Sequence, residues 1–195
     1  MLEAIKDIVH PDVVINQDTA KKELMLKEDG ADSKISKLFI TNIPDNAFAF
    51  TLDHQPGGDN NRWFSQLSPY VNKSNGKGVN KGCDLIVLWC EAHVHTALVF
   101  DLKSDKPKVE ATQKQLDNSE LFLKYLLSMI ATHYGITTNS VVIKKAIVTT
   151  DKRSIRKGPS YRHKAEPSKV GNYNIETVVP KARKEGYIAL KQLAR

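Results

Sequence analysis

The chain has 195 residues, of which 41% are hydrophobic and 26% charged, with a net charge of +7 and two cysteines. These values fit one globular domain, alone or with an appendage, and they exclude both a disordered chain and a disulfide-stapled one. The first residues lack the pattern of a signal peptide, and every apolar run is too short to cross a membrane, so we expect a cytoplasmic protein without membrane contact.

The N-terminal part of the chain predicts two helices and two short strands. Apolar residues at helical spacing predict a helix over residues 2–9, and a second amphipathic helix is expected over 19–27, closed by Gly30. Short strands are expected at 35–39 and 48–52, on either side of a turn. The polar segments 54–62 and 72–82 are expected to be loops, the second of which carries three lysines.

The middle of the chain is the most strongly patterned region. Two apolar runs, 83–89 and 96–100, are joined by a short link and predict a β-hairpin in the core of a sheet. Leucines at helical spacing then predict a helix over 109–134, with a break or a second helix start near 118–120. Strand composition returns at 141–150, and 187–193 is expected to be a last strand rather than a short helix.

Two aspartates and a lysine are expected to meet at one edge of this hairpin. Asp84 opens the first apolar run, and the second runs directly into Asp101, Leu102 and Lys103. The start of one antiparallel strand neighbours the end of the other, and residues 101 and 103 project from the same face. Two carboxylates and the Leu102 carbonyl suit a hard divalent cation, Mg²⁺ or Mn²⁺. The spacing alone is also compatible with a structure that has no metal site, in which Asp84 is exposed to solvent and Asp101 forms an ordinary ion pair with Lys103.

The order of these features resembles the PD-(D/E)XK nuclease superfamily over residues 82–134. The resemblance implies an α/β fold with a central mixed β-sheet flanked by helices, a restriction-endonuclease-like core. It also implies that Asp84 and Asp101 are metal ligands, that Lys103 is the catalytic lysine, and that a glutamine of the following helix lies near the site. Gln115 is the first candidate for that glutamine, and Gln113 is the second.

The same resemblance suggests a further acid and shows one departure. Members of the superfamily often carry an additional acid on the first helix, for which Glu3 is our first candidate and Glu23 our second. Cys83 stands where the motif's name places proline. Cys83 and Cys90 lie in an apolar run without the ligand spacing of a zinc site, so we expect buried free thiols.

The C-terminal part of the chain is strongly basic. Residues 143–195 hold 14 Lys and Arg against four acids, a net charge of +10, whereas residues 1–142 carry −3. Such a segment suits the phosphates of nucleic acid, and an aromatic side chain can stack on a base. We expect DNA, in preference to RNA, to contact Lys152, Arg153, Arg156, Lys157, Tyr161, Arg162 and Lys164.

Together these patterns predict one domain with two parts. Residues 1–142 form a nuclease-like core, and residues 143–195 supply the last strands and the basic segment. The function implied by the resemblance is metal-dependent DNA endonuclease activity, of the kind that serves restriction, repair and phage defence. A non-catalytic module that binds nucleic acid or protein, or a subunit of a larger complex, is the alternative. A homodimer is compatible with either function.

Three other sets of residues could be taken for functional sites, but each has a simpler structural explanation. His93 and His95 share a face in the hairpin link, and without a third ligand we expect a solvated turn. The triplet at 76–78, Gly-Lys-Gly, lacks the spacing of a nucleotide-binding phosphate loop. Asp53 and His54 end an expected strand beside a glycine-rich loop, where we expect turn capping, with a position at the border of the site as the alternative.

Overall fold

The computed structural model describes residues 1–28, 30, 33–54, 67–72, 74, 76–103, 109–150, 168–170 and 173–195, which contain both helices and strands. The first elements are α1 (Leu2–Ile8), η1 (Pro11–Val13), β1 (Glu23–Lys27), β2 (Lys37–Thr41) and β3 (Phe48–Phe50). The central elements are β4 (Leu85–Glu91), β5 (Val94–Lys103), α3 (Val109–Tyr134) and β6 (Val142–Thr149). The last are β7 (Ser168–Val170), β8 (Tyr173–Thr177), η4 (Ala182–Lys184), β9 (Glu185–Ala189) and α4 (Leu190–Leu193).

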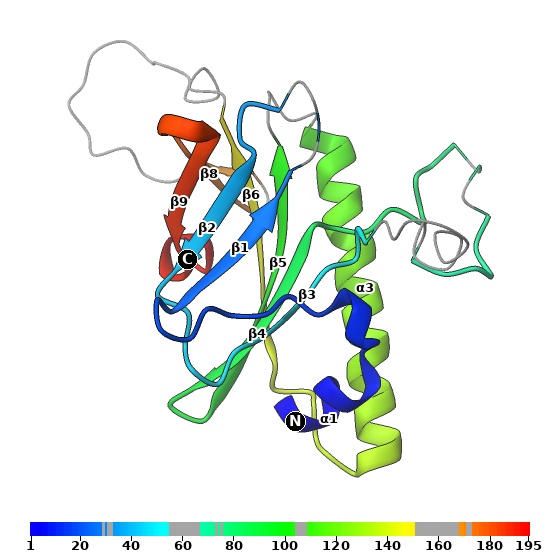
Figure 1. The fold of residues 1–195 in the computed structure, drawn as a ribbon. Helices are drawn as coiled ribbons and strands as arrows, with labels where there is room; N and C mark the ends of the chain where they lie inside the picture. The colour runs from blue at the N-terminus through cyan, green and yellow to red at the C-terminus, as the bar shows by residue number, and fades with distance from the viewer. Residues whose placement is uncertain are drawn as a thin grey trace.

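The strands form two sheets. A six-stranded mixed sheet has the order β3-β4-β5-β6-β8-β7, in which β3, β4 and β5 are antiparallel and β6 lies parallel to β5. A three-stranded sheet has the order β1-β2-β9. Figure 1 shows α3 on one face of the larger sheet and the smaller sheet on the other. The expectation of an α/β fold with a mixed sheet flanked by helices is therefore confirmed at this level.

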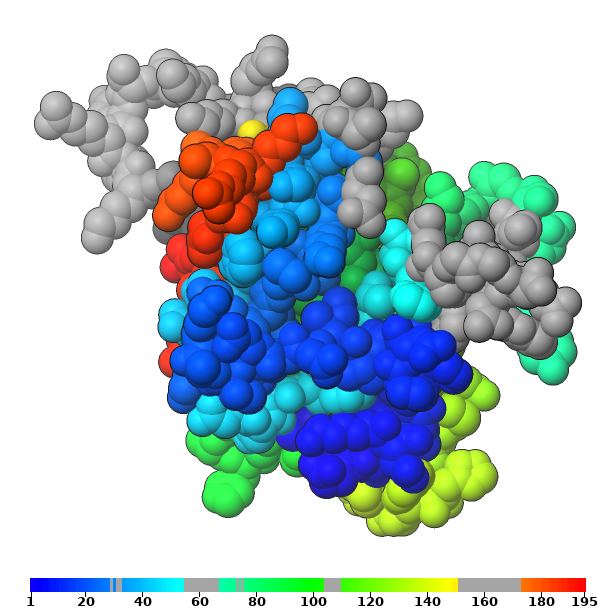
Figure 2. Space-filling model, in the orientation of Figure 1, coloured from blue at the N-terminus to red at the C-terminus, as the bar shows by residue number. Residues whose placement is uncertain are grey.

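The larger sheet buries apolar side chains on both faces. Alternate residues of β4 and β5, among them Leu85, Leu98 and Phe100, pack against the smaller sheet in one core cluster. The intervening residues, among them Ile86 and Val99, pack against α1 and α3 in a second cluster. A strand that is buried on both faces is a nearly continuous apolar run, which explains the sequence of this region. In Figure 2, residues 1–52 spread across the front of the molecule and largely cover these strands.

The predicted hairpin and the helix after it are confirmed. Strands β4 and β5 pair from Leu85↔Phe100 to Glu91↔Val94, and Ala92 and His93, both with positive φ, make the two-residue turn. Helix α3 runs unbroken over the range expected from its leucines, so the expected break near 118–120 is wrong. The Ser119 hydroxyl hydrogen-bonds to the Gln115 carbonyl within the helix, so this polar residue does not interrupt it.

Two sequence-based assignments are wrong. Residues 23–27 form strand β1 rather than the end of a helix, because Leu24 and Leu26 alternate with exposed Met25 and pair antiparallel with β2. The buried side chains of this segment therefore repeat every two residues, as in a strand, rather than every 3.6, as in a helix. Pairing with β2 is what identifies the segment as a strand. The last expected strand is β9, which starts two residues earlier, at Glu185, and gives way to α4 at Leu190.

The described residues include no helix with both the length and the hydropathy needed to cross a membrane. The seven basic-segment residues expected to contact DNA fall within 151–167, which lies outside the described part.

Candidate active site

The pairing of β4 and β5 brings Asp84 and Asp101 to the same edge of the sheet. Leu85 pairs with Phe100, so one further step in this register places Asp84 opposite Asp101. The Asp84 carboxylate turns toward β5 and accepts a hydrogen bond from the backbone N–H of Leu102, with 2.5 Å between N and Oδ2. The hairpin therefore produces the juxtaposition of the two carboxylates that the sequence predicts.

Asp101 is an unusual buried acid. Its side chain has 0% exposure, and no described residue gives either of its oxygens a hydrogen bond of normal geometry. The compensation that the structure provides is the ammonium of Lys103, 2.6 Å from Oδ2 and 31% exposed. An ionised carboxylate out of water is costly unless it is paired or binds a metal. Burial raises the pKa of Asp101 to about 6, although Lys103 acts in the opposite direction.

Burial and the nearby charges also shift the pKa values of Asp84 and Lys103. Burial, and then the negative charge of Asp101, raises the pKa of Asp84 well above its usual range. Burial by itself would lower the pKa of Lys103, but the carboxylates of Asp101 and Asp84 outweigh it and raise the pKa. Lys103 is therefore a charged donor in the protein as it stands, rather than a neutral base.

Helix α3 contributes Gln115 to the site. Its Oε1 atom accepts from Lys103 Nζ at 3.5 Å, and its Nε2 atom donates to the carbonyl oxygen of Gly82, two residues before Asp84. One side chain thus joins both segments of the site. The sequence left Gln115 and Gln113 as alternatives, and of the two it is Gln115 that contacts Lys103.

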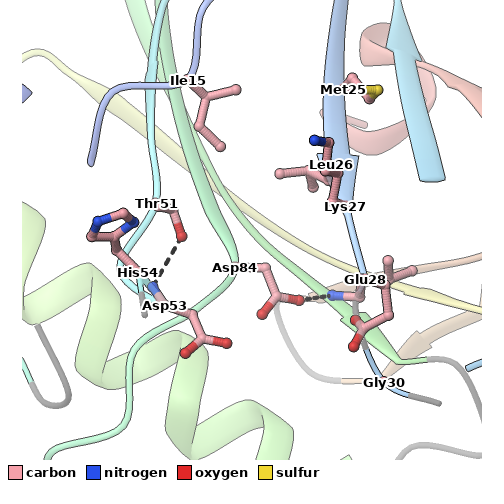
Figure 3. Close-up of a pocket in the computed structure, with 11 residues that line it drawn as sticks. Ile15, Met25, Leu26, Lys27, Glu28, Gly30, Thr51, Asp53, His54 and Asp84 are labelled. Carbon is pink, nitrogen blue, oxygen red and sulfur yellow. Dashed lines mark hydrogen bonds between the residues drawn. The ribbon is translucent and has the colours of Figure 1, made fainter. Parts of the chain in front are cut away.

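A cavity of about 560 Å³ opens beside these residues. Figure 3 shows the carboxylates of Asp84, Asp53 and Glu28 turned toward this space from three separate segments of the chain. Glu28 directly follows β1, and Asp53 lies just beyond β3. The negative charge of Asp53 acts on both Asp84 and Asp101, and that of Glu28 acts on Asp101. Lys27 also lines the cavity, so the charged residues described in its lining are three acids and one lysine, and their net charge is negative.

The sequence did not single out Glu28, and for Asp53 it favoured turn capping over a position at the border of the site. Glu28 adjoins a segment that was expected to be helical, so nothing indicated that it would face the hairpin edge. An alternating Leu24-Met25-Leu26 pattern was the signal that could have placed this segment in a sheet. The edge of the smaller sheet then brings Glu28 to the cavity.

The residues present suit a hard divalent cation held mainly by two carboxylates. Among the residues described, no three His, Cys, Asp or Glu side chains are arranged to hold one ion. The carboxylates of Asp101 and Asp84 are the two strongest ligand candidates, with the Leu102 carbonyl as the third oxygen that the sequence suggested. Mg²⁺ commonly binds one or two protein carboxylates and keeps several waters, for which Asp53 and Glu28 are suitable acceptors.

The structure does not bring the two expected first-helix acids to this site. Glu3 is 87% exposed and pairs with Lys6 at 2.8 Å. Its helix, α1, lies near the far end of α3, where Asp7 accepts a hydrogen bond from Tyr134 (Figure 1). Tyr134 is 19 residues beyond Gln115, which corresponds to about 28 Å of helix. Glu23 begins β1 and is paired with Thr41, at the opposite end of that strand from Glu28.

The two cysteines are free thiols, as expected. Cys83 is buried, and burial raises the pKa of its thiol to about 12, so it is not a nucleophile at neutral pH. Its backbone N–H donates to the Ser119 hydroxyl at 2.8 Å, which ties the start of β4 to α3. Cys90 is partly exposed near the hairpin turn.

No protein-family model matches the chain, and comparisons with curated proteins and with solved structures find no match either.

Proposed function

We propose that this chain is a Mg²⁺- or Mn²⁺-dependent nuclease domain with a restriction-endonuclease-like core that hydrolyses phosphodiester bonds in DNA. The observation that carries the proposal is the fully buried Asp101 carboxylate, whose Oδ1 atom accepts no hydrogen bond from the described residues, beside Asp84, which lines an acidic cavity. The ion pair with Lys103 compensates Oδ2 but leaves Oδ1 without a donor among the described residues, and a bound cation would compensate both oxygens.

The arrangement of elements supports the same proposal. Apart from η1 and the smaller sheet's β1 and β2, which lie between α1 and β3, the chain runs α1, β3, β4, β5, α3, β6. This order combines a helix, an antiparallel three-stranded meander, a second helix and a strand parallel to the third. Asp84 precedes the second strand of that meander, and Asp101 and Lys103 end the third. Gln115 then comes from the helix that follows. These are the positions at which the PD-(D/E)XK resemblance places its functional residues.

The chemistry follows from the charges of the site. A divalent cation bound here neutralises phosphate charge and lowers the pKa of a water that it binds. Asp84 and Asp101 would hold that cation, and the Lys103 ammonium would place a positive charge where the phosphoryl oxygens gain negative charge. Gln115 keeps Lys103 in position through its Oε1 atom. Asp53 and Glu28, which line the cavity, would accept hydrogen bonds from the attacking water and orient it.

The test is a cleavage assay on plasmid and single-stranded DNA, with Mg²⁺, Mn²⁺ or EDTA. We expect metal-dependent cleavage that falls by at least about 10²-fold in Asp101→Ala and in Lys103→Ala, which each remove a charged group from the reaction. Glu3→Ala, which removes an exposed acid from α1, is the matched control and should cleave normally. DNA binding without cleavage under every condition would refute the nuclease and indicate a binding module instead.

A further inference from the structure

A lysine-bearing loop, residues 76–82, is held against the N-terminal half of α3 beside the candidate site. The Asn118 side-chain amide donates to the carbonyl oxygen of Gly78 at 2.8 Å and to that of Lys81 at 3.4 Å. The amide of Gln115 donates to the last carbonyl of the same loop. Asn118 and Gln115 are three residues apart on one helix face, so both hold the loop backbone from the same side.

The loop and the first turns of α3 line a second cavity, of about 530 Å³. Its lining residues are Gly76, Lys77, Gly78, Lys81, Glu110, Ala111 and Lys114. Three of them are lysines with exposed side chains, and the one acid, Glu110, is paired with Lys114 at 2.7 Å. The lining residues that the structure describes thus carry a net charge of +2, in contrast to the acidic cavity that Asp84 lines.

This basic cavity lies close to the acidic one along the chain. Lys81 precedes Asp84 by three residues, so their Cα atoms are at most about 11 Å apart. Gln115 bridges the two regions, because it bonds both to the loop and to Lys103. One strand of duplex DNA advances about 3.4 Å per nucleotide along the helix axis, so 11 Å corresponds to about three nucleotides.

We propose that the Lys77, Lys81 and Lys114 cavity binds the phosphodiester backbone of DNA beside the bond at the Asp84–Asp101 site, with Lys81 within about three nucleotides of that bond. This inference rests on the proposed nuclease function of that site. Lysine ammonium groups bind phosphates as point charges and do not read base edges, so the contact is independent of sequence. Asn118 and Gln115 fix the loop, so the cations are in place before DNA arrives.

The test measures binding of a 20-base-pair duplex by fluorescence anisotropy in EDTA, across a series of salt concentrations. In the Lys77→Ala/Lys81→Ala variant, the slope of log K against log salt should become about 1.8 smaller in magnitude, because two phosphate contacts are lost. The same loss corresponds to a fall in affinity of about 10- to 100-fold at 0.1 M salt. Lys77→Arg/Lys81→Arg keeps both charges and should retain the wild-type slope.

The control removes the same charge elsewhere. Lys6→Ala/Lys21→Ala deletes two exposed lysines that pair with Glu3 and Asp18, and it should leave the slope unchanged. An unchanged slope in the Lys77→Ala/Lys81→Ala variant, or an equal loss in the control, would overturn the inference.

Failure of the binding site and failure of the nuclease are distinguishable, because the binding assay needs neither metal nor cleavage. Lysine-dependent binding without any cleavage would refute the nuclease and support the binding site. Cleavage by a Lys77→Ala/Lys81→Ala variant with a wild-type salt slope would refute the binding site alone.

Discussion

Replacing Asp101 with asparagine should stabilise the metal-free protein. The pKa of Asp101 is raised from its ordinary value of 3.8 to about 6, mainly by burial. Above pH 6 the folded protein must carry a carboxylate that its surroundings disfavour, whereas below 3.8 both the folded and unfolded states are neutral at this position. The penalty is therefore fully present above pH 6 and disappears as the pH falls toward 3.8.

The size of the effect follows from the shift. Each pKa unit corresponds to about 1.36 kcal/mol, so ionised Asp101 costs the folded state about 3 kcal/mol at pH 8. A neutral amide of the same shape avoids that cost. For a chain of this length, 3 kcal/mol raises Tm by about 6–12 °C, which is the upper limit for Asp101→Asn because the amide must still find hydrogen-bond partners.

The assay is chemical denaturation in EDTA at pH 8 and at pH 4.5, so that no bound cation offsets the penalty. Asp101→Asn should be more stable than wild type at pH 8, and the gain should shrink at pH 4.5.

Asp117→Asn is the matched control, for which the expected change in stability has the opposite sign. Burial disfavours the Asp117 carboxylate, but hydrogen bonds from Lys145 and Tyr173 lower its pKa, so its loss should destabilise at pH 8 and matter less in acid. An Asp101→Asn variant that is less stable at pH 8, or a gain that is independent of pH, would refute the reasoning.

Two further predictions concern the walls of the site. Gly82→Ala should destabilise the protein by about 1–3 kcal/mol in urea denaturation, since its Cβ would lie 2.7 Å from the Leu52 Cβ and 2.8 Å from the Leu52 carbonyl oxygen; an unchanged midpoint would contradict this close approach. Glu28→Gln should weaken Mg²⁺ binding several-fold by calorimetry without changing stability, because a charge facing the cavity is lost, whereas Glu3→Gln should bind Mg²⁺ as wild type does. Equal Mg²⁺ affinity in wild type and Glu28→Gln would exclude Glu28 from the cation's surroundings.

Periodicity and spacing were sufficient to predict the centre of the fold. The apolar runs of β4 and β5 and the leucines of α3 are each long enough to define their own structure, because burial on both sheet faces or along one helix face leaves a strong pattern. The alternation of side chains along a strand likewise places Asp101 and Lys103 on the same face without knowledge of the rest of the chain.

Tertiary structure decided which distant segments complete the site. Strand β1 is short and charged, so its alternating leucines acquired meaning only through pairing with β2 and burial between the two sheets. That packing turns Glu28 toward Asp84 and leaves Glu3 at the far end of α3. Local sequence determines which face a side chain occupies, but the neighbours of that face depend on which apolar surfaces pack together. The Asp84–Asp101 pair could therefore be predicted from one hairpin, whereas the acidic cavity around it required the whole chain.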